Sequence, residues 1–111
     1  MIRLVPIILL ITLLLANDGE GPLFTNIIPI TDFYYGSSLQ INTQAIDKDG
    51  IEEITLYYRF NKNDNYKNIT MKKEINYYAT IPAFEVNSKT IEYYFLGADK
   101  FGNQSTFPMG G

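Results

Sequence analysis

Apolar and polar side chains alternate along most of the chain beyond residue 38. In residues 39–46, apolar or small side chains fall on every second position, and Gln40, Asn42 and Gln44 lie between them. Residues 53–60 show the same two-residue period. Successive side chains of a β-strand point to opposite faces, so this pattern predicts strands with one buried face. No stretch after residue 16 keeps the 3.6-residue period of an amphipathic helix, so we expect no substantial helix there.

Turn-forming residues separate the alternating runs at intervals that are typical of an all-β protein. Asp49-Gly50 and Gly102-Asn103 mark two of the turns, because these residue types tolerate a positive φ. We predict seven strands, over residues 24–30, 39–46, 53–60, 66–71, 75–82, 90–98 and 104–107. Pro29 places the first of them at a sheet edge or a kink. The sequence therefore predicts an antiparallel β-sandwich, with Ile75, Tyr77, Ala79 and Ile81 facing inward in the fifth run.

The tyrosines indicate which faces of the predicted strands are buried. Eight of the nine stand in adjacent pairs, at 34–35, 57–58, 77–78 and 93–94. Within a strand, a pair places one ring in the core and the other on the sheet surface. From the alternation we assign Tyr58 and Tyr94 to the core, together with Leu96 and Ala98, and Tyr57 and Tyr93 to the surface.

The N-terminus differs in composition from the rest of the chain. Residues 1–16 carry one positive charge, at Arg3, followed by roughly 13 apolar residues, which is short of the ~20 needed to span a bilayer as a helix. We expect a signal peptide ending at Ala16, or an uncleaved signal-anchor, since Leu14 is bulky where cleavage favours a small residue. Residues 17–22 form a polar linker, and residues 23–109 the sandwich. The predicted location is therefore the periplasm, the outer envelope or the extracellular space.

Composition excludes several functions. The chain has neither histidine nor cysteine, so the usual general base, the thiol nucleophile, disulfides and thiol or imidazole metal ligands are missing. The net charge is −3, and a nucleic-acid interface needs a clustered positive surface instead. No serine has a partner motif that would activate it. We therefore predict a protein without catalytic residues or a cofactor, which is not an enzyme and does not bind nucleic acid.

Several segments resemble the bacterial immunoglobulin-like domains related to fibronectin type III. In the first half these segments are residues 38–41, 45–51 and 54–59, and in the second half residues 77–82, 91–99 and 102–103. The resemblance implies an immunoglobulin-like sandwich of about seven strands, found in exported proteins as a spacer, an adhesive unit or a support for a neighbouring domain. It also implies a tyrosine corner, in which a tyrosine near the start of the sixth strand hydrogen-bonds back to the chain upstream, and Tyr94 is the candidate. The chain is either the N-terminal part of a larger protein or a small envelope protein that acts alone.

In such a sandwich, residues 53–60 and 90–98 form neighbouring strands of one sheet. Their predicted outward side chains include Tyr57, Arg59, Tyr93 and Phe95, which would form an aromatic patch that binds a neighbouring domain or envelope protein. A glycan is a second candidate ligand, and the missing tryptophan favours protein contact. The alternative is that these rings only stabilise the sheet by cross-strand pairing.

Three acids lie in loops that should meet at one end of the sandwich. Asp47 and Asp49 precede one predicted strand and Asp99 follows another, and their carboxylates could bind a hard cation such as Ca²⁺. Aspartate is also an ordinary turn residue, and the spacing matches no calcium-loop motif. The sequence leaves both interpretations open and favours the turn.

Overall fold

The computed structural model describes residues 19–25 and 33–108. Within them the chain forms eight β-strands and one single-turn 3-10 helix, η1. In chain order these are β1 (Leu23–Thr25), β2 (Leu39–Ile46), β3 (Ile51–Arg59), β4 (Lys67–Thr70), β5 (Lys72–Lys73), β6 (Tyr77–Ile81), η1 (Ala83–Glu85), β7 (Glu92–Asp99) and β8 (Gln104–Phe107). In the described ranges, no helix is long and apolar enough to cross a membrane.

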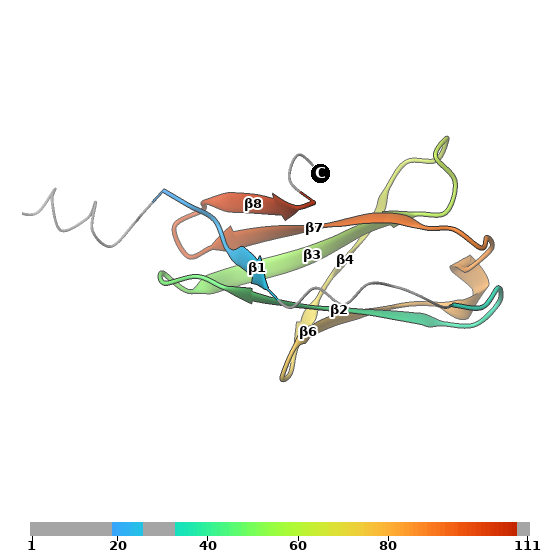
Figure 1. Ribbon diagram of the computed structural model, residues 1–111, viewed down its shortest axis with the longest axis horizontal. Helices are drawn as coiled ribbons and strands as arrows, with labels where there is room; N and C mark the ends of the chain where they lie inside the picture. The colour runs from blue at the N-terminus through green and yellow to red at the C-terminus, as the bar shows by residue number, and fades with distance from the viewer. Residues whose placement is uncertain (1–18, 26–32, 109–111) are drawn as a thin grey trace, which may run out of the picture.

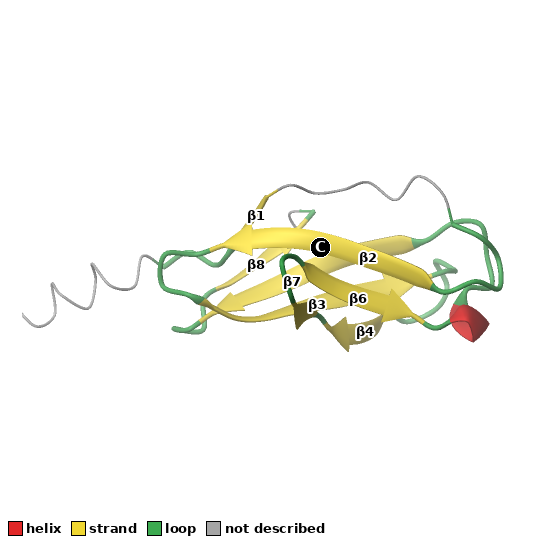
Figure 2. Ribbon diagram, turned by 90° about the horizontal axis from the view of Figure 1, so that it is seen from below, coloured by secondary structure: helices red, strands yellow, loops and turns green. Residues whose placement is uncertain are grey.

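The strands form two four-stranded sheets, which lie one above the other in Figure 1 and are seen from below in Figure 2. One sheet has the order β1-β2-β6-β5 and the other β4-β3-β7-β8, and the pairs within each sheet are antiparallel. The predicted all-β sandwich is therefore confirmed. Two predicted strand ranges, 39–46 and 104–107, coincide with β2 and β8.

Alternating side chains of both sheets meet in the middle of the sandwich. On β3, Ile54, Leu56 and Tyr58 are buried, as the two-residue period predicts. On β2 the buried positions are Leu39, Ile41 and Thr43. The remaining core side chains are Met71, Ala79, Ile81, Val86 and Phe95. Burial of these apolar surfaces, at roughly 25 cal/mol per Å², is the main force that holds the two layers together.

The chain passes from one sheet to the other between β4 and β5. Met71 still donates a backbone hydrogen bond to Ile54 of β3, at 2.8 Å, and the next residue, Lys72, pairs with Tyr78 of β6. The Met71 side chain is buried in the core. A single residue thus links the two layers along this side of the sandwich.

On the opposite side, the segment before β1 lies against β8. A Cβ atom at Gly21 would approach the carbonyl carbon of Gln104 to 2.4 Å, so only glycine fits this crossing. The Ser105 hydroxyl donates a hydrogen bond to the carbonyl oxygen of Pro22. The N-terminal segment is therefore bound to both sheets.

The predicted faces of β7 are wrong. Phe95 is 1% exposed and lies in the core, and Tyr93 packs partly buried against it, whereas Tyr94 and Leu96 lie on the opposite, outer face. The antiparallel register explains this, because Tyr94 pairs with the outward Tyr57 and Phe95 with the buried Leu56. The inward prediction for Ile75 is also wrong: β6 begins two residues later, and Ile75 lies 88% exposed in the β5–β6 turn.

Candidate functional site

The outer face of the β4-β3-β7-β8 sheet carries a group of three tyrosines. The rings of Tyr57 and Tyr94 are stacked with their centroids 4.8 Å apart and their planes 4° from parallel. Tyr66, in the loop before β4, meets Tyr94 edge to face at 5.1 Å. Stacked and edge-to-face pairs of this kind are worth about 0.5–1.5 kcal/mol beyond the area that they bury.

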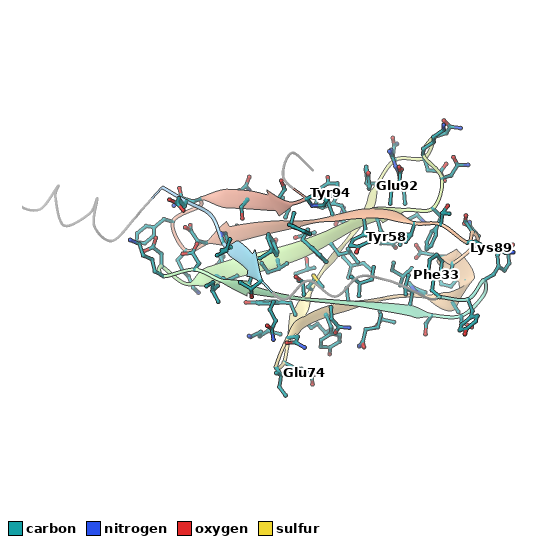
Figure 3. All side chains as sticks on the ribbon, in the orientation of Figure 1. Phe33, Tyr58, Glu74, Lys89, Glu92 and Tyr94 are labelled. Carbon is teal, nitrogen blue, oxygen red and sulfur yellow. The ribbon has the colours of Figure 1, made fainter. Side chains whose placement is uncertain are left out.

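An ion pair borders these rings. The guanidinium of Arg59 lies over the Tyr66 ring, 4.2 Å from its centroid, and its Nε donates a hydrogen bond to Oε1 of Glu92 at 2.7 Å. Figure 3 shows Glu92 and Tyr94 on the outer side of β7, and Tyr58 between the sheets. The pairing of Arg59 with Glu92 across β3 and β7 places both side chains on the same face as the tyrosines. We call this set, Tyr57, Arg59, Tyr66, Glu92 and Tyr94, the outer-face cluster.

A groove adjoins the outer-face cluster where β8 ends. Its volume is about 420 Å³. It is lined by Tyr66, Ile91, Glu92, Tyr93, Tyr94, Phe107 and Pro108. The walls are thus mainly aromatic, with one carboxylate among them. Such a surface suits an apolar group that also carries a positive charge or a hydrogen-bond donor.

The structure separates the four residues of the predicted patch. It places Tyr57 and Arg59 on the outer face as predicted, but Phe95 is in the core and Tyr93 packs against the core, so neither belongs to the patch. The tyrosine-corner prediction for Tyr94 is also wrong, because its ring lies on the outer face and its hydroxyl bonds to no residue in the described ranges.

Tyr66 and Glu92 are not among the residues that the sequence predicted for this surface. Tyr66 is the one tyrosine outside the adjacent pairs, and it lies in the loop between β3 and β4, where alternation carries no information. Glu92 could have been found from the register, since a glutamate facing Arg59 across paired strands is an expected cross-strand pair.

Burial raises the pKa of the Tyr94 hydroxyl above its usual value, and the neighbouring hydroxyls of Tyr57 and Tyr66 raise it further. Burial likewise raises the pKa of Tyr93. Both phenols are therefore neutral at physiological pH and can only act there as neutral hydrogen-bonding groups. The outer-face cluster is thus suited to hold a partner through ring contacts and hydrogen bonds.

The inward member of the second tyrosine pair makes a different contact. The Tyr58 hydroxyl donates a hydrogen bond of 2.6 Å to Oε1 of Glu85, which also accepts one of 3.1 Å from Nζ of Lys67. The bond from Tyr58, followed by the bond and charge of Lys67, lowers the pKa of Glu85 against the opposing effect of its burial. Burial, and then the bond to Glu85, raises the pKa of Tyr58 far above its usual value. This network fixes η1 to β3 and β4.

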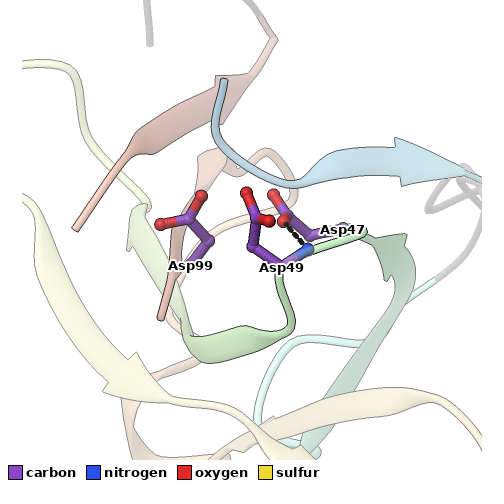
Figure 4. Close-up of side chains that lie close together, drawn as sticks. All are labelled: Asp47, Asp49 and Asp99. Carbon is purple, nitrogen blue, oxygen red and sulfur yellow. Dashed lines mark hydrogen bonds between the residues drawn. The ribbon is translucent and has the colours of Figure 1, made fainter. Parts of the chain in front are cut away.

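The three predicted loop aspartates do come together (Figure 4). Asp47, Asp49 and Asp99 each bring a carboxylate oxygen within 4.8 Å of the others. Oδ1 of Asp47 accepts a hydrogen bond of 2.8 Å from the backbone N–H of Asp49, closing the turn at Gly50. The turn interpretation therefore explains the position of the Asp47 carboxylate, and three carboxylates are few for Ca²⁺, which takes six to eight oxygen ligands.

Asp99 has the strongest structural role of the three. It is 2% exposed, and its oxygens accept hydrogen bonds from the N–H groups of Phe101 and Asn103, each at 2.9 Å, and from the Asn103 amide at 3.0 Å. Burial alone would raise its pKa, but these hydrogen bonds outweigh burial and hold the pKa below its usual value. Asp99 thus organises the β7–β8 loop.

Comparison of the sequence with models of known protein families and with curated proteins gave no match. The outer-face cluster and the groove beside it are therefore the features of the described residues that bear on function.

Proposed function

We propose that this chain is a non-catalytic, exported immunoglobulin-like module of the bacterial cell envelope, which acts as a structural or protein-interaction unit through its outer-face cluster. The observation that carries this proposal is the cluster itself. It combines three partly exposed tyrosines with an arginine, and tyrosine and arginine are enriched among the residues that dominate binding energy at protein interfaces.

The strand order supports the immunoglobulin-like part of the proposal. The constant-type immunoglobulin sandwich has strands A, B, E and D in one sheet and C, F and G in the other. Here β1-β2-β6-β5 has the order A-B-E-D, and β3-β7-β8 has the order C-F-G with β4 added beside C. Export is supported by the composition of residues 1–16. A fold of this kind hosts many functions, so the functional part depends on the outer-face cluster.

A photocrosslinking amino acid at position 57 tests the proposal in the cell that produces the protein. We expect a discrete crosslink to one envelope protein, and we expect Tyr66→Ala to weaken it. Position 78 is the matched control, because Tyr78 is also a half-buried tyrosine on an outer face, but of the other sheet. Crosslinking at position 78 equal to that at position 57, or none at position 57, would contradict the proposal.

A carbohydrate-binding accessory module is the second candidate function. The exposed rings of the outer-face cluster, with Arg59 and Glu92 as polar neighbours, are the observation that favours it. Binding of the purified chain to a glycan array, lost in Tyr57→Ala and Tyr66→Ala but kept in Tyr78→Ala, would replace the protein-contact proposal with this one.

A further inference from the structure

β7 is longer than its partner β8, and it begins before the point at which β8 ends beside it. The last pair between them joins Phe95 to Phe107, whereas β7 extends back to Glu92. On its other side β7 stays paired with β3 as far as Arg59, which lies opposite Glu92. Residues 92–94 therefore form a sheet edge that no strand among the described residues covers.

The groove of about 420 Å³ lies at this edge. Side chains from both faces of β7 surround it, because Glu92 and Tyr94 point to the outer face beside Tyr66, and Tyr93 points inward beside Phe107. An uncovered strand edge offers backbone N–H and C=O groups, and the alternating side chains next to it form separate pockets. Extended peptides bind other proteins at sites of this type by adding a strand.

We propose that the edge formed by Glu92, Tyr93 and Tyr94 binds an extended segment of a partner protein, which adds to the sheet as a short strand in line with β8. This inference rests on the proposed protein-interaction function and names the kind of partner segment. A strand that runs in the direction of β8 places successive residues opposite Tyr94, Tyr93 and Glu92.

The side chains at the edge define what the segment must contain. The residue opposite Tyr93 points inward, toward Phe107, and has to be apolar. The residue opposite Glu92 points outward and should be basic, because one Glu92 oxygen accepts the bond from Arg59 and the side chain remains 53% exposed. The guanidinium of Arg59 already rests on the Tyr66 ring, which shows that this ring can hold a cation. The net charge of −3 also favours a basic partner.

A second folded copy fits this edge less well than a single segment. β8 covers the rest of the same edge, so an approaching sandwich would meet β8 and Pro108 before it could pair with three residues of β7. A single extended strand needs no such clearance.

Nuclear magnetic resonance titration of the isotope-labelled full chain, in a neutral detergent, tests the proposal. The probe is a blocked peptide with the sequence valine-arginine-threonine-threonine, in which valine lies opposite Tyr93 and arginine opposite Glu92, so that no residue falls opposite Phe95, where Phe107 lies. We expect shifts of the backbone amide signals of residues 92–94 and of Phe107, and no comparable shifts on the β1-β2-β6-β5 sheet. A peptide with glutamate in place of arginine is the matched control and should bind more weakly.

Two sets of variants separate strand addition from simple side-chain contact. N-methylation of valine or of its neighbour removes one peptide N–H at a time, and only the N–H that faces β7 should matter, with a loss of about two- to tenfold in affinity. Glu92→Gln should weaken the arginine peptide about two- to fivefold, the range of an exposed ion pair. Glu52→Gln is the control, because Glu52 also makes an exposed ion pair, with Lys100.

Three outcomes would overturn the proposal. These are no shifts at residues 92–94 with millimolar peptide, equal effects of the two N-methylations, or slow hydrogen exchange of the edge amides in the peptide-free chain, which would mean that the chain's own residues cover the edge. If crosslinking from position 57 succeeds while the titration fails, the interaction function stands and the strand-addition site does not.

Discussion

Phe95→Ala and Tyr94→Ala form the most direct test of the β7 faces, because the two positions are adjacent and should behave in opposite ways. Phe95 is 1% exposed, stacks on Phe24 at a centroid distance of 5.7 Å and meets Tyr93 edge to face at 5.7 Å. Removing such a ring leaves a cavity and should cost about 3–5 kcal/mol of unfolding free energy.

Tyr94→Ala loses less. Its ring is partly exposed and has its main contact with Tyr57, so the cost should be about 1–2 kcal/mol. A domain of this size has a total stability of roughly 5–15 kcal/mol, so the two losses are easily distinguished by urea unfolding followed by circular dichroism.

An equal loss in both variants, or a larger loss in Tyr94→Ala, would refute the assignment of Phe95 to the core. If Phe95→Ala fails to fold, Phe95→Leu and Tyr94→Leu give the same comparison with smaller volume changes. The larger loss should again occur at position 95.

Three further predictions concern single contacts. Tyr58→Phe removes a hydrogen bond to a charged acceptor, Glu85, and should lower the free energy of unfolding by about 1.5–3 kcal/mol in thermal melts. Tyr94→Phe is the control and should change the free energy of unfolding by less than about 0.5 kcal/mol. Gly97→Val should lower the melting temperature sharply, since even a Cβ atom there lies 3.0 Å from Cδ1 of Ile54; a melting temperature within a degree of the original would contradict this packing. The pKa values of Glu85 and Asp99 are lowered in the folded state, so both groups stabilise the fold at a pH above their unfolded-state pKa values near 4, and this stabilisation should be lost as the pH falls through the folded-state values. Asp99→Asn should therefore make the free energy of unfolding depend less on pH in the acid range. An unchanged pH dependence would count against the Asp99 contacts.

Much of the fold was predictable because its strands alternate clearly. In β2 the polar residues Gln40, Asn42 and Gln44 mark the outer face, so both the bounds and the inward side were predicted correctly. In β7 the run from Tyr93 to Ala98 has no charged or strongly polar residue on either face, so alternation could not say which side was buried. The register of β7 against β3 decides which face of β7 is buried. Register is a property of the strand pairing, and the sequence of a single strand does not encode it.

The candidate site was predictable only in part for the same reason. Tyr57 and Arg59 lie on a strand with clear alternation, and both were placed correctly. Tyr93 and Phe95 were placed on the wrong face of β7, and Tyr66 comes from a loop whose path depends on tertiary packing. Alternation also does not show that β8 ends at Phe107, so that among the described residues no strand pairs with residues 92–94 on that side of β7.

The crossing at Met71 and the N-terminal segment over β8 have a consequence for aggregation. Strand edges are the usual starting points of intermolecular sheet growth, and lysines, short strands and covering segments protect against it. Here β5 is two residues long and consists of Lys72 and Lys73, while Gly21 and Pro22 lie against β8. Growth of fibrils through the β5 and β8 borders is therefore disfavoured.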